Sequence, residues 1–187
     1  MTTSTTQWRS LLAAAGIALI ALAGFIRFTS TDGADGSGSS RPATGMTNLV
    51  VTIGDRSFTM TNGLASAEIT PDSATPNTVR VIGEPAVGDV NRDGRPDAAL
   101  LIESDSGGGG NFFYAVLAVN ESGSYRATNA LLLGDRIAPI TVDFLDGRFV
   151  YNYDDRVPGE PVSARPSVQK SLWIRFDQES GDISAGT

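Results

Sequence analysis

Oxygen-bearing side chains occupy alternate positions in the stretch GDVNRDGRPDAALLIE, which runs from Gly88 to Glu103. Counted from the first aspartate, positions one, three, five, six and nine are Asp89, Asn91, Asp93, Gly94 and Asp97. Proteins bind calcium through about six to eight oxygens, and calcium loops use this spacing, with glycine at the sharp turn of position six and a backbone carbonyl at position seven. Position seven is Arg95, so the predicted ligands are the four Asp and Asn side chains and the Arg95 carbonyl.

The same stretch also has a purely structural interpretation. Asp and Asn side chains accept hydrogen bonds from nearby backbone in turns, and glycine supplies the positive φ that such turns need. Position twelve is Leu100 rather than the bidentate glutamate of an EF-hand, and strands rather than helices are predicted on both sides. An EF-hand is excluded, whereas a calcium loop and an Asx-rich turn both remain open, with Arg92 and Arg95 able to point outward.

The loop resembles the calcium loops of FG-GAP repeats and similar β-propeller blades, in which a D-x-[DN]-x-D-G-x-x-D motif runs directly into an apolar strand. That resemblance implies calcium bound by the side chains of Asp89, Asn91, Asp93 and Asp97 and by the carbonyl of Arg95. It covers the loop alone, because about 140 residues without a repeat cannot form a propeller of four or more blades.

A longer stretch, from Val87 to Tyr153, resembles a group of small exported bacterial proteins of unknown function. The resemblance is carried by GDVNRDGRPDAALLIE, by the Gly-rich turn and aromatic strand GGGGNFFYAVLAV, and by LLLGDRI and VDFLDGRFV. Members of that group are commonly lipoproteins, whereas this chain has no cysteine to carry a lipid. The resemblance implies export and a β architecture, and it implies no reaction.

The composition excludes several kinds of site. Histidine and cysteine are both absent from the 187 residues, which removes cysteine nucleophiles, Ser-His-Asp triads, imidazole or thiolate metal sites and disulfides. Any metal must therefore be a hard one bound through oxygen. The 21 acidic residues outnumber the 14 basic ones, so nucleic acid is not an expected partner, and a cation or a basic partner suits the chain better.

Two other groups of side chains have a functional interpretation beside a structural one. Glu103 and Asp105 would line the acidic cleft of a calcium-assisted hydrolase acting on envelope glycans or phosphoesters, although isolated acids at strand ends are usually solvated. The aromatic runs around Phe112 and Tyr151 either stack on sugar rings or a peptide, or fill the core as aromatic strand residues usually do.

The elements that position these side chains are predicted to be β-strands. Short apolar or alternating runs, rich in β-branched and aromatic residues, begin after Met46, and none has the helical i, i+3, i+4, i+7 pattern. These runs are 48–53, 57–62, 66–70, 78–83, 98–103, 112–119, 125–133, 138–145, 148–153 and 172–176. Two of them, 98–102 and 112–119, are apolar on both faces, which predicts central strands covered on both sides. The sequence therefore predicts an all-β, mostly antiparallel sandwich or barrel-like domain over 47–187.

An N-terminal hydrophobic helix and a flexible linker are predicted to precede this domain. Residues 11–26, LLAAAGIALIALAGFI, are uncharged and apolar, slightly short of the roughly 20 residues that cross a bilayer unless aromatic flanks extend them. Residues 1–28 are therefore either a retained signal anchor or a signal peptide cleaved after the small-x-small triplet at 21–23. Residues 29–46 are rich in Gly, Ser, Thr and Asp, which predicts a flexible linker.

These features predict a compartment and a class of function. The expected protein is an exported β domain tethered to the cytoplasmic membrane and displayed in the periplasm or outside the cell; the alternative is secretion after cleavage. Its expected role is that of a non-catalytic binding or envelope-associated module with a structural calcium loop at 89–97 and an envelope protein or glycan as partner. The hydrolase described above and a purely structural envelope protein remain as alternatives.

Overall fold

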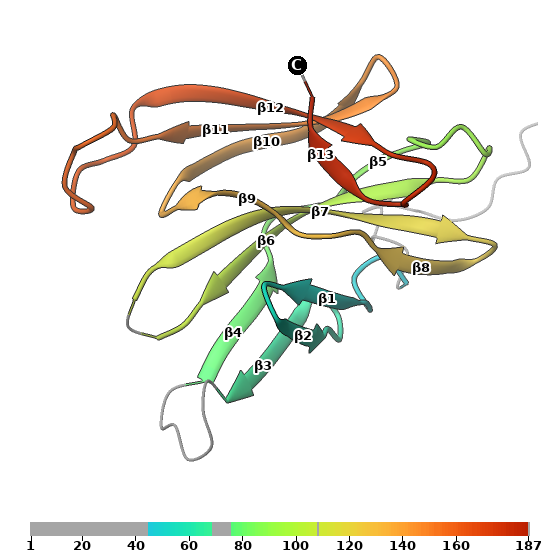
Figure 1. The fold of residues 1–187 in the computed structure, drawn as a ribbon, viewed down its shortest axis with the longest axis horizontal. Helices are drawn as coiled ribbons and strands as arrows, with labels where there is room; N and C mark the ends of the chain where they lie inside the picture. Colours follow the sequence, from blue (N-terminus) through green and yellow to red (C-terminus); the bar gives the residue numbers. More distant parts are fainter. Residues whose placement is uncertain (1–44, 69–75, 108, 187) are drawn as a thin grey trace, which may run out of the picture. The chain divides into compact units, whose positions relative to one another are not determined.

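The structure is a computed structural model, and it describes residues 45–68, 76–107 and 109–186. Every regular element in these residues is a β-strand, and every strand pair is antiparallel (Figure 1). The prediction of an all-β, antiparallel domain is therefore confirmed. The predicted hydrophobic segment at 1–28 lies outside the described residues, and within them no helix has the length and apolar character needed to cross a membrane.

The strands form three hydrogen-bonded groups. A hairpin pairs β1 (Val50–Ile53) with β2 (Arg56–Thr59). The largest sheet has the order β3-β4-β6-β7-β8, with β5 also paired to β6 and β9 to β7. Its strands are β3 (Leu64–Glu68), β4 (Pro76–Val81), β5 (Ala86–Gly88), β6 (Asp97–Asp105), β7 (Asn111–Glu121), β8 (Ser124–Ala127) and β9 (Leu131–Asp135). The remaining sheet has the order β10-β11-β12-β13 and consists of β10 (Ala138–Leu145), β11 (Arg148–Asp155), β12 (Val168–Phe176) and β13 (Ile183–Ala185).

Tight turns join the hairpin strands where their residue types predict them. Asp146 and Gly147 have φ values of 52° and 74°, so the β10–β11 connection has the positive φ at both central residues that defines a type I′ turn. Ser122 and Gly123, at 57° and 100°, join β7 to β8 in the same way. These turns fix the register of both hairpins.

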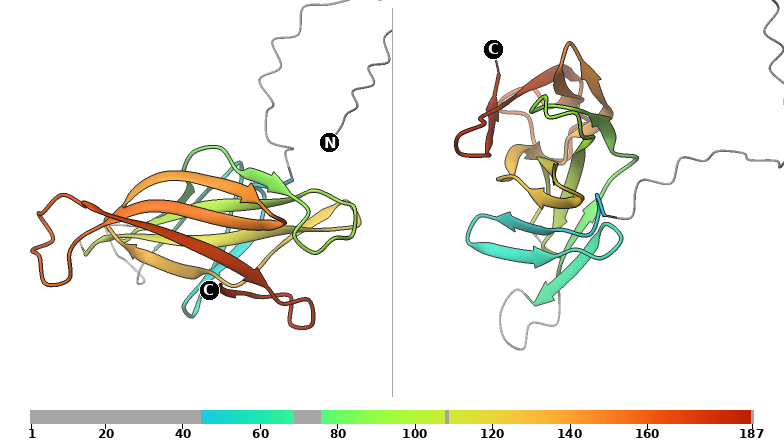
Figure 2. Two further views of the ribbon diagram at one scale, coloured as in Figure 1. Left: turned by 90° about the horizontal axis from the view of Figure 1, so that it is seen from above. Right: turned by 90° about the vertical axis from the view of Figure 1, so that its right-hand side faces the viewer.

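Strands β6 and β7 have a packed core on each face, as their two-sided apolar pattern predicts. On one face, Leu101 and Leu117 pack in a cluster with residues of β11, β12 and β13. On the other face, Leu100 and Val116 pack with the β1–β2 hairpin, and Met46 at the end of the predicted linker is buried in the same cluster. Figures 1 and 2 show the β6–β7 layer between the hairpin and the β10–β13 sheet. This face-to-face packing is consistent with a β-sandwich.

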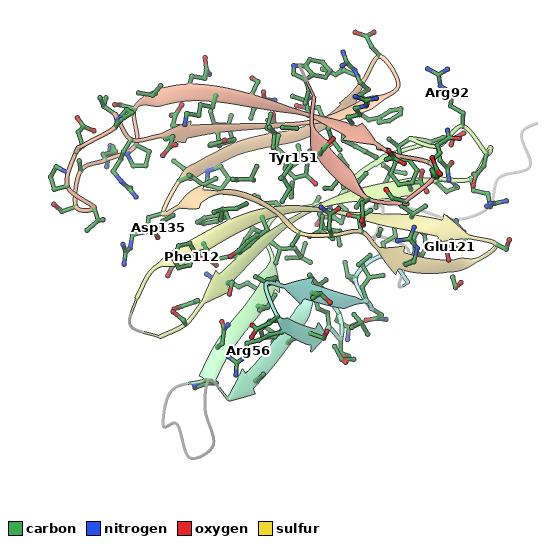
Figure 3. All side chains as sticks on the ribbon, viewed as in Figure 1. Arg56, Arg92, Phe112, Glu121, Asp135 and Tyr151 are labelled. Carbon is green, nitrogen blue, oxygen red and sulfur yellow. The ribbon has the colours of Figure 1, made fainter. Side chains whose placement is uncertain are left out.

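The aromatic residues of β11 fill the core between the sheets. Tyr151 is buried, and its hydroxyl donates toward the carbonyl oxygens of Leu100 and Val116 at 3.1 and 3.2 Å (Figure 3). Burial raises the pKa of Tyr151, which keeps the hydroxyl protonated. Phe149 is also buried, with its ring centroid 4.7 Å from that of Phe144. For these rings the core interpretation is confirmed.

Close packing between β5 and β10 holds the start of the oxygen-rich loop. Gly88, the last residue of β5, lies against the Phe144 ring so closely that a Cβ at this position would overlap it. Only glycine allows this approach of backbone to ring. Gly88 also pairs with Asp97, the first residue of β6. The two ends of loop 89–97 therefore lie side by side at one end of the central strand.

Candidate metal centre

The polar side chains of loop 89–97 turn inward onto the loop's own backbone. The amide N–H of Asp93 donates to Asp89 Oδ1 at 3.0 Å and to Asn91 Oδ1 at 3.1 Å. The side-chain oxygens of two predicted ligands therefore accept from the same backbone amide. Asp89 Oδ2 accepts from the Gly94 amide and Asp93 Oδ1 from the Arg95 amide, both at 2.9 Å. The loop thus brings Asp89, Asn91 and Asp93 together in a single turn.

Two residues of the loop have left-handed backbone conformations. Gly94 has a φ of 81°, as its place at the sharp turn predicts, and Arg92 has a φ of 61°. The conformation is easy for glycine and unfavourable for arginine, whose Cβ crowds the following carbonyl. The Arg92 side chain projects away from the loop (Figure 3). The Arg95 side chain instead folds back, and its guanidinium donates to Asp93 Oδ2 at 2.6 Å and to the Asn120 carbonyl at 3.1 Å.

Asp97 is the most deeply buried of the predicted ligands, with a solvent exposure of 0%. Its Oδ2 accepts from the Val90 amide at 3.0 Å, and its Oδ1 accepts from the Asn120 amide at 2.9 Å. Burial raises the pKa of Asp97, and the amide hydrogen bonds from Asn120 and Val90 oppose that rise. Among the ion pairs of the described residues, none includes this carboxylate. Amide dipoles alone therefore compensate its charge.

The loop matches a hard cation in the chemistry of its donors. The five predicted ligands all offer oxygen, three of them as carboxylates, which is the donor set that calcium prefers. Within the described residues, however, no three acidic side chains form a group arranged to hold a metal ion. Asp93 is occupied by Arg95, and both oxygens of Asp97 face amides. A cation would have to compete with the Arg95 guanidinium for the Asp93 carboxylate.

A pocket of about 360 Å³ opens beside the loop, between the β7–β8 turn and the connection from β12 to β13. Asp93 and Arg95 line one side of it, and Glu121 and Arg126 line another. Each acid is paired with the arginine next to it, at 2.6 Å in both cases. The charges in this pocket are therefore balanced by the chain itself.

Glu103 and Asp105, the acids of the predicted hydrolase cleft, are held by hydrogen bonds. Glu103 is buried; its Oε2 is bound by the Arg80 guanidinium, and its Oε1 accepts from the Asn111 side-chain amide at 2.9 Å. Asp105 Oδ1 accepts from the Gly107 amide at 2.8 Å in the turn that follows β6. Glu103 thus joins β6 to its two neighbouring strands, whereas the exposed Asp105 closes the turn that follows β6.

Comparison with protein-family models, with curated proteins and with solved structures found no match. The resemblances of the loop and of the stretch from Val87 to Tyr153 therefore stay predictions from sequence motifs.

Proposed function

We propose that this chain is an exported, non-catalytic binding or envelope-associated module whose β domain is stabilised by calcium at loop 89–97. The observation that carries the proposal is the fully buried Asp97 carboxylate, which joins the loop to β7 and forms no ion pair among the described residues. A buried carboxylate is costly when amide dipoles, rather than a positive charge, are what compensates it. A divalent cation next to Asp97 supplies the missing positive charge.

The proposed ligands are the side chains of Asp89, Asn91, Asp93 and Asp97 and the backbone carbonyl of Arg95. Calcium bound there acts as a structural ion and takes part in no reaction. Because the loop ends where β6 begins, the ion stabilises the attachment of the loop to the central strand. A ligand that binds the folded state and not the unfolded state raises the free energy of unfolding by mass action. The increase is about 2.7 kcal/mol when the ligand concentration is about a hundred times Kd.

Residues 1–46 supply the tether in this proposal. The apolar segment 11–26 serves as a signal anchor, or as a signal peptide removed on export, and the linker 29–46 separates the membrane from the domain. The domain then lies in the periplasm or outside the cell, where calcium-binding modules work with affinities of about 10⁻⁴ to 10⁻³ M. Its binding partner is an envelope protein or a glycan.

The hydrogen bonds of Glu103 support a non-catalytic role over the hydrolase alternative, which needs both Glu103 and Asp105. A general acid or nucleophile has to reach its substrate, whereas both oxygens of Glu103 are engaged by Arg80 and Asn111. The absence of histidine and cysteine from the chain supports the same conclusion, because it removes two common catalytic groups.

The test is a calorimetric titration of calcium into the full chain, purified in a neutral detergent and stripped with a chelator, with a thermal melt at each concentration. Asp93→Ala removes a proposed ligand, and Asp143→Ala is the matched control, an aspartate on β10 that accepts side-chain hydrogen bonds from Thr141 and Asn152. We expect one saturable site and a raised Tm in the wild type and in the control, and neither in Asp93→Ala. No heat and no Tm shift in the wild type would reduce the loop to an Asx-rich turn.

A further inference from the structure

A second pocket lies on the other side of loop 89–97 and is lined by arginines. It has a volume of about 240 Å³ and lies between the loop, the β10–β11 turn and the end of β12. Its charged residues are Arg92 from the loop, Arg148 at the start of β11 and Arg175 near the end of β12, and all three are exposed. No residue that lines the pocket is acidic.

The three arginines converge from elements far apart in the sequence. The Arg92 guanidinium reaches the β10–β11 turn, where a Cβ on Gly147 would lie 3.8 Å from its Nη2. Arg148 follows that glycine directly, and its guanidinium stacks over the Trp173 ring at 4.8 Å. Trp173 lies on β12, two residues before Arg175. Loop, turn and strand thus place three positive charges around one cavity.

These charges are not compensated by ion pairs within the described residues. The ion pairs found there involve Arg80, Arg95, Arg126, Arg136 and Lys170. Arg92, Arg148 and Arg175 take part in none of them. Asp177, the acid closest in sequence to Arg175, lies outside the pocket and uses Oδ1 to accept from the amides of Glu179 and Ser180. Those hydrogen bonds first, and the charge of Arg175 to a smaller extent, lower the pKa of Asp177, so Arg175 has a nearby acid but no ion pair with it.

Like charges that converge without a counterion repel one another, and an anion between them removes that repulsion. Guanidinium groups match the paired oxygens of phosphate in both geometry and charge. We propose that Arg92, Arg148 and Arg175 form a binding site for a phosphate-type oxyanion. The site goes beyond the proposed calcium role and does not depend on it.

The walls of the pocket indicate the size and nature of the bound group. Val90, Ile174 and Phe176 also line the cavity and supply an apolar surface beside the guanidiniums. A volume of about 240 Å³ is below the range of roughly 300 to 1,000 Å³ that is usual for drug-sized ligands. The pocket therefore suits a phosphate group with a short organic substituent, which exists both in free phosphate esters and in phospholipid headgroups.

The experiment is a calorimetric titration of the full chain in neutral detergent, dialysed free of calcium and chelator so that no calcium phosphate forms. One arm uses inorganic phosphate, and the other uses short-chain phosphatidylglycerol below its micelle concentration. Tighter binding of phosphate would support a free phosphate compound as the ligand. Tighter binding of the lipid would support a headgroup at the membrane surface. Saturable binding in either arm, weakened by added salt, is the expected result.

Substitutions assign the binding to the pocket. We expect Arg92→Gln, Arg148→Gln and Arg175→Gln each to raise Kd about tenfold or more, since a charge-assisted hydrogen bond is lost. Two controls should bind as the wild type does: Arg126→Gln, an arginine paired with Glu121 in the neighbouring pocket, and Arg165→Gln, an exposed arginine outside both pockets.

Arg175→Lys separates recognition from charge, because lysine keeps the positive charge and loses the planar fork. We expect it to bind more weakly than the wild type and more tightly than Arg175→Gln, with an unchanged Tm. Absence of saturable binding in both arms would overturn the proposal. Equal binding by the wild type and the triple Gln variant would overturn it as well. Calcium binding can fail without affecting either outcome.

Discussion

Two buried carboxylates lie toward opposite ends of β6, and the chain compensates them differently. Asp97, the first residue of the strand, is 0% exposed and accepts hydrogen bonds from two backbone amides. Glu103, near the other end, is 4% exposed and is bound by the Arg80 guanidinium and the Asn111 amide. Removing a carboxylate from water costs several kcal/mol unless its charge is compensated. Among the described residues, a positive charge of the chain's own pairs with Glu103 and none pairs with Asp97.

This difference indicates where an external cation can act. At Glu103 the compensating charge comes from β4 and the amide from β7, so the three neighbouring strands are braced without a ligand. At Asp97 the amides come from Val90 in the loop and Asn120 on β7, and no cationic side chain of the described ranges pairs with the carboxylate. We infer that the Asp97 end of β6 responds to calcium and that the Glu103 end does not.

The largest effect is expected from Asp97→Ala. The substitution leaves the amides of Val90 and Asn120 without an acceptor, and each unsatisfied buried donor costs about 1–3 kcal/mol. We therefore expect the free energy of unfolding to fall by about 3–5 kcal/mol in urea titrations without calcium. Asp97→Asn keeps one amide oxygen and should lose roughly half as much.

The comparison between the two ends fails if Asp97→Ala costs less than Arg80→Ala under the same conditions. A small loss would mean that water replaces the carboxylate at both amides. Calcium left on the wild type would enlarge the apparent loss of unfolding free energy in Asp97→Ala. The control is therefore protein that was loaded with calcium and then stripped with a chelator, which should give the same loss as protein that never met calcium.

An intermediate effect is expected from Arg80→Ala, which leaves Glu103 with Asn111 as its remaining side-chain partner. Breaking an enclosed pair costs about 3–5 kcal/mol, but the Arg80 side chain is 56% exposed, so water takes over part of its role. We therefore expect a loss of about 1–2 kcal/mol, which is reduced when Glu103→Gln is added because the buried charge is then removed.

A double-mutant cycle on Arg80 and Glu103, measured by urea unfolding, gives the coupling between the two side chains. Zero coupling would show that the pair does not compensate the buried charge. Calcium should leave the coupling unchanged, because neither residue belongs to loop 89–97.

The strands of this fold could largely be predicted because their signals are local. Two-sided apolar runs identified β6 and β7 as central strands, and Asp146-Gly147 identified the β10–β11 turn. The predicted run 125–133 is in fact divided between β8 and β9, because Thr128 lies between them and its Oγ1 accepts from the Leu117 amide. Strands β5 and β13 were missed, since three residues are too short to show an alternation.

The candidate sites also differ in whether their residues are close together in the sequence. The oxygen donors of loop 89–97 follow one another in the chain, so their spacing could be read directly. The amide of Asn120 that binds Asp97 comes from another strand, and no spacing connects the two. The arginine pocket depends on the folding that places Arg92 at the same cavity as Arg148 and Arg175, which lie more than 50 residues further along the chain. Sequence patterns carry no signal for contacts that arise only when sheets pack.

The smallest effect is expected at Asp155, which is paired like Glu103 but more exposed. Its Oδ2 lies 2.6 Å from Lys170 Nζ, with side-chain exposures of 23% for Asp155 and 47% for Lys170. The hydrogen bond from Lys170 lowers the pKa of Asp155 below its ordinary value of 3.8. Because the folded pKa is the lower one, the pair's contribution is present above pH 3.8 and is lost as the pH falls through the lowered folded value.

Asp155→Asn should therefore reduce the free energy of unfolding by less than about 1 kcal/mol near neutral pH, and the loss should shrink in acid and in high salt. Urea unfolding of both proteins across this pH range measures the difference. If the loss matched that of Arg80→Ala, pairing itself would set the cost. If the loss stays well below that value, burial sets the cost. An added cation should then matter more at Asp97, which is buried and has no ion pair within the described part of the chain, than at Asp155.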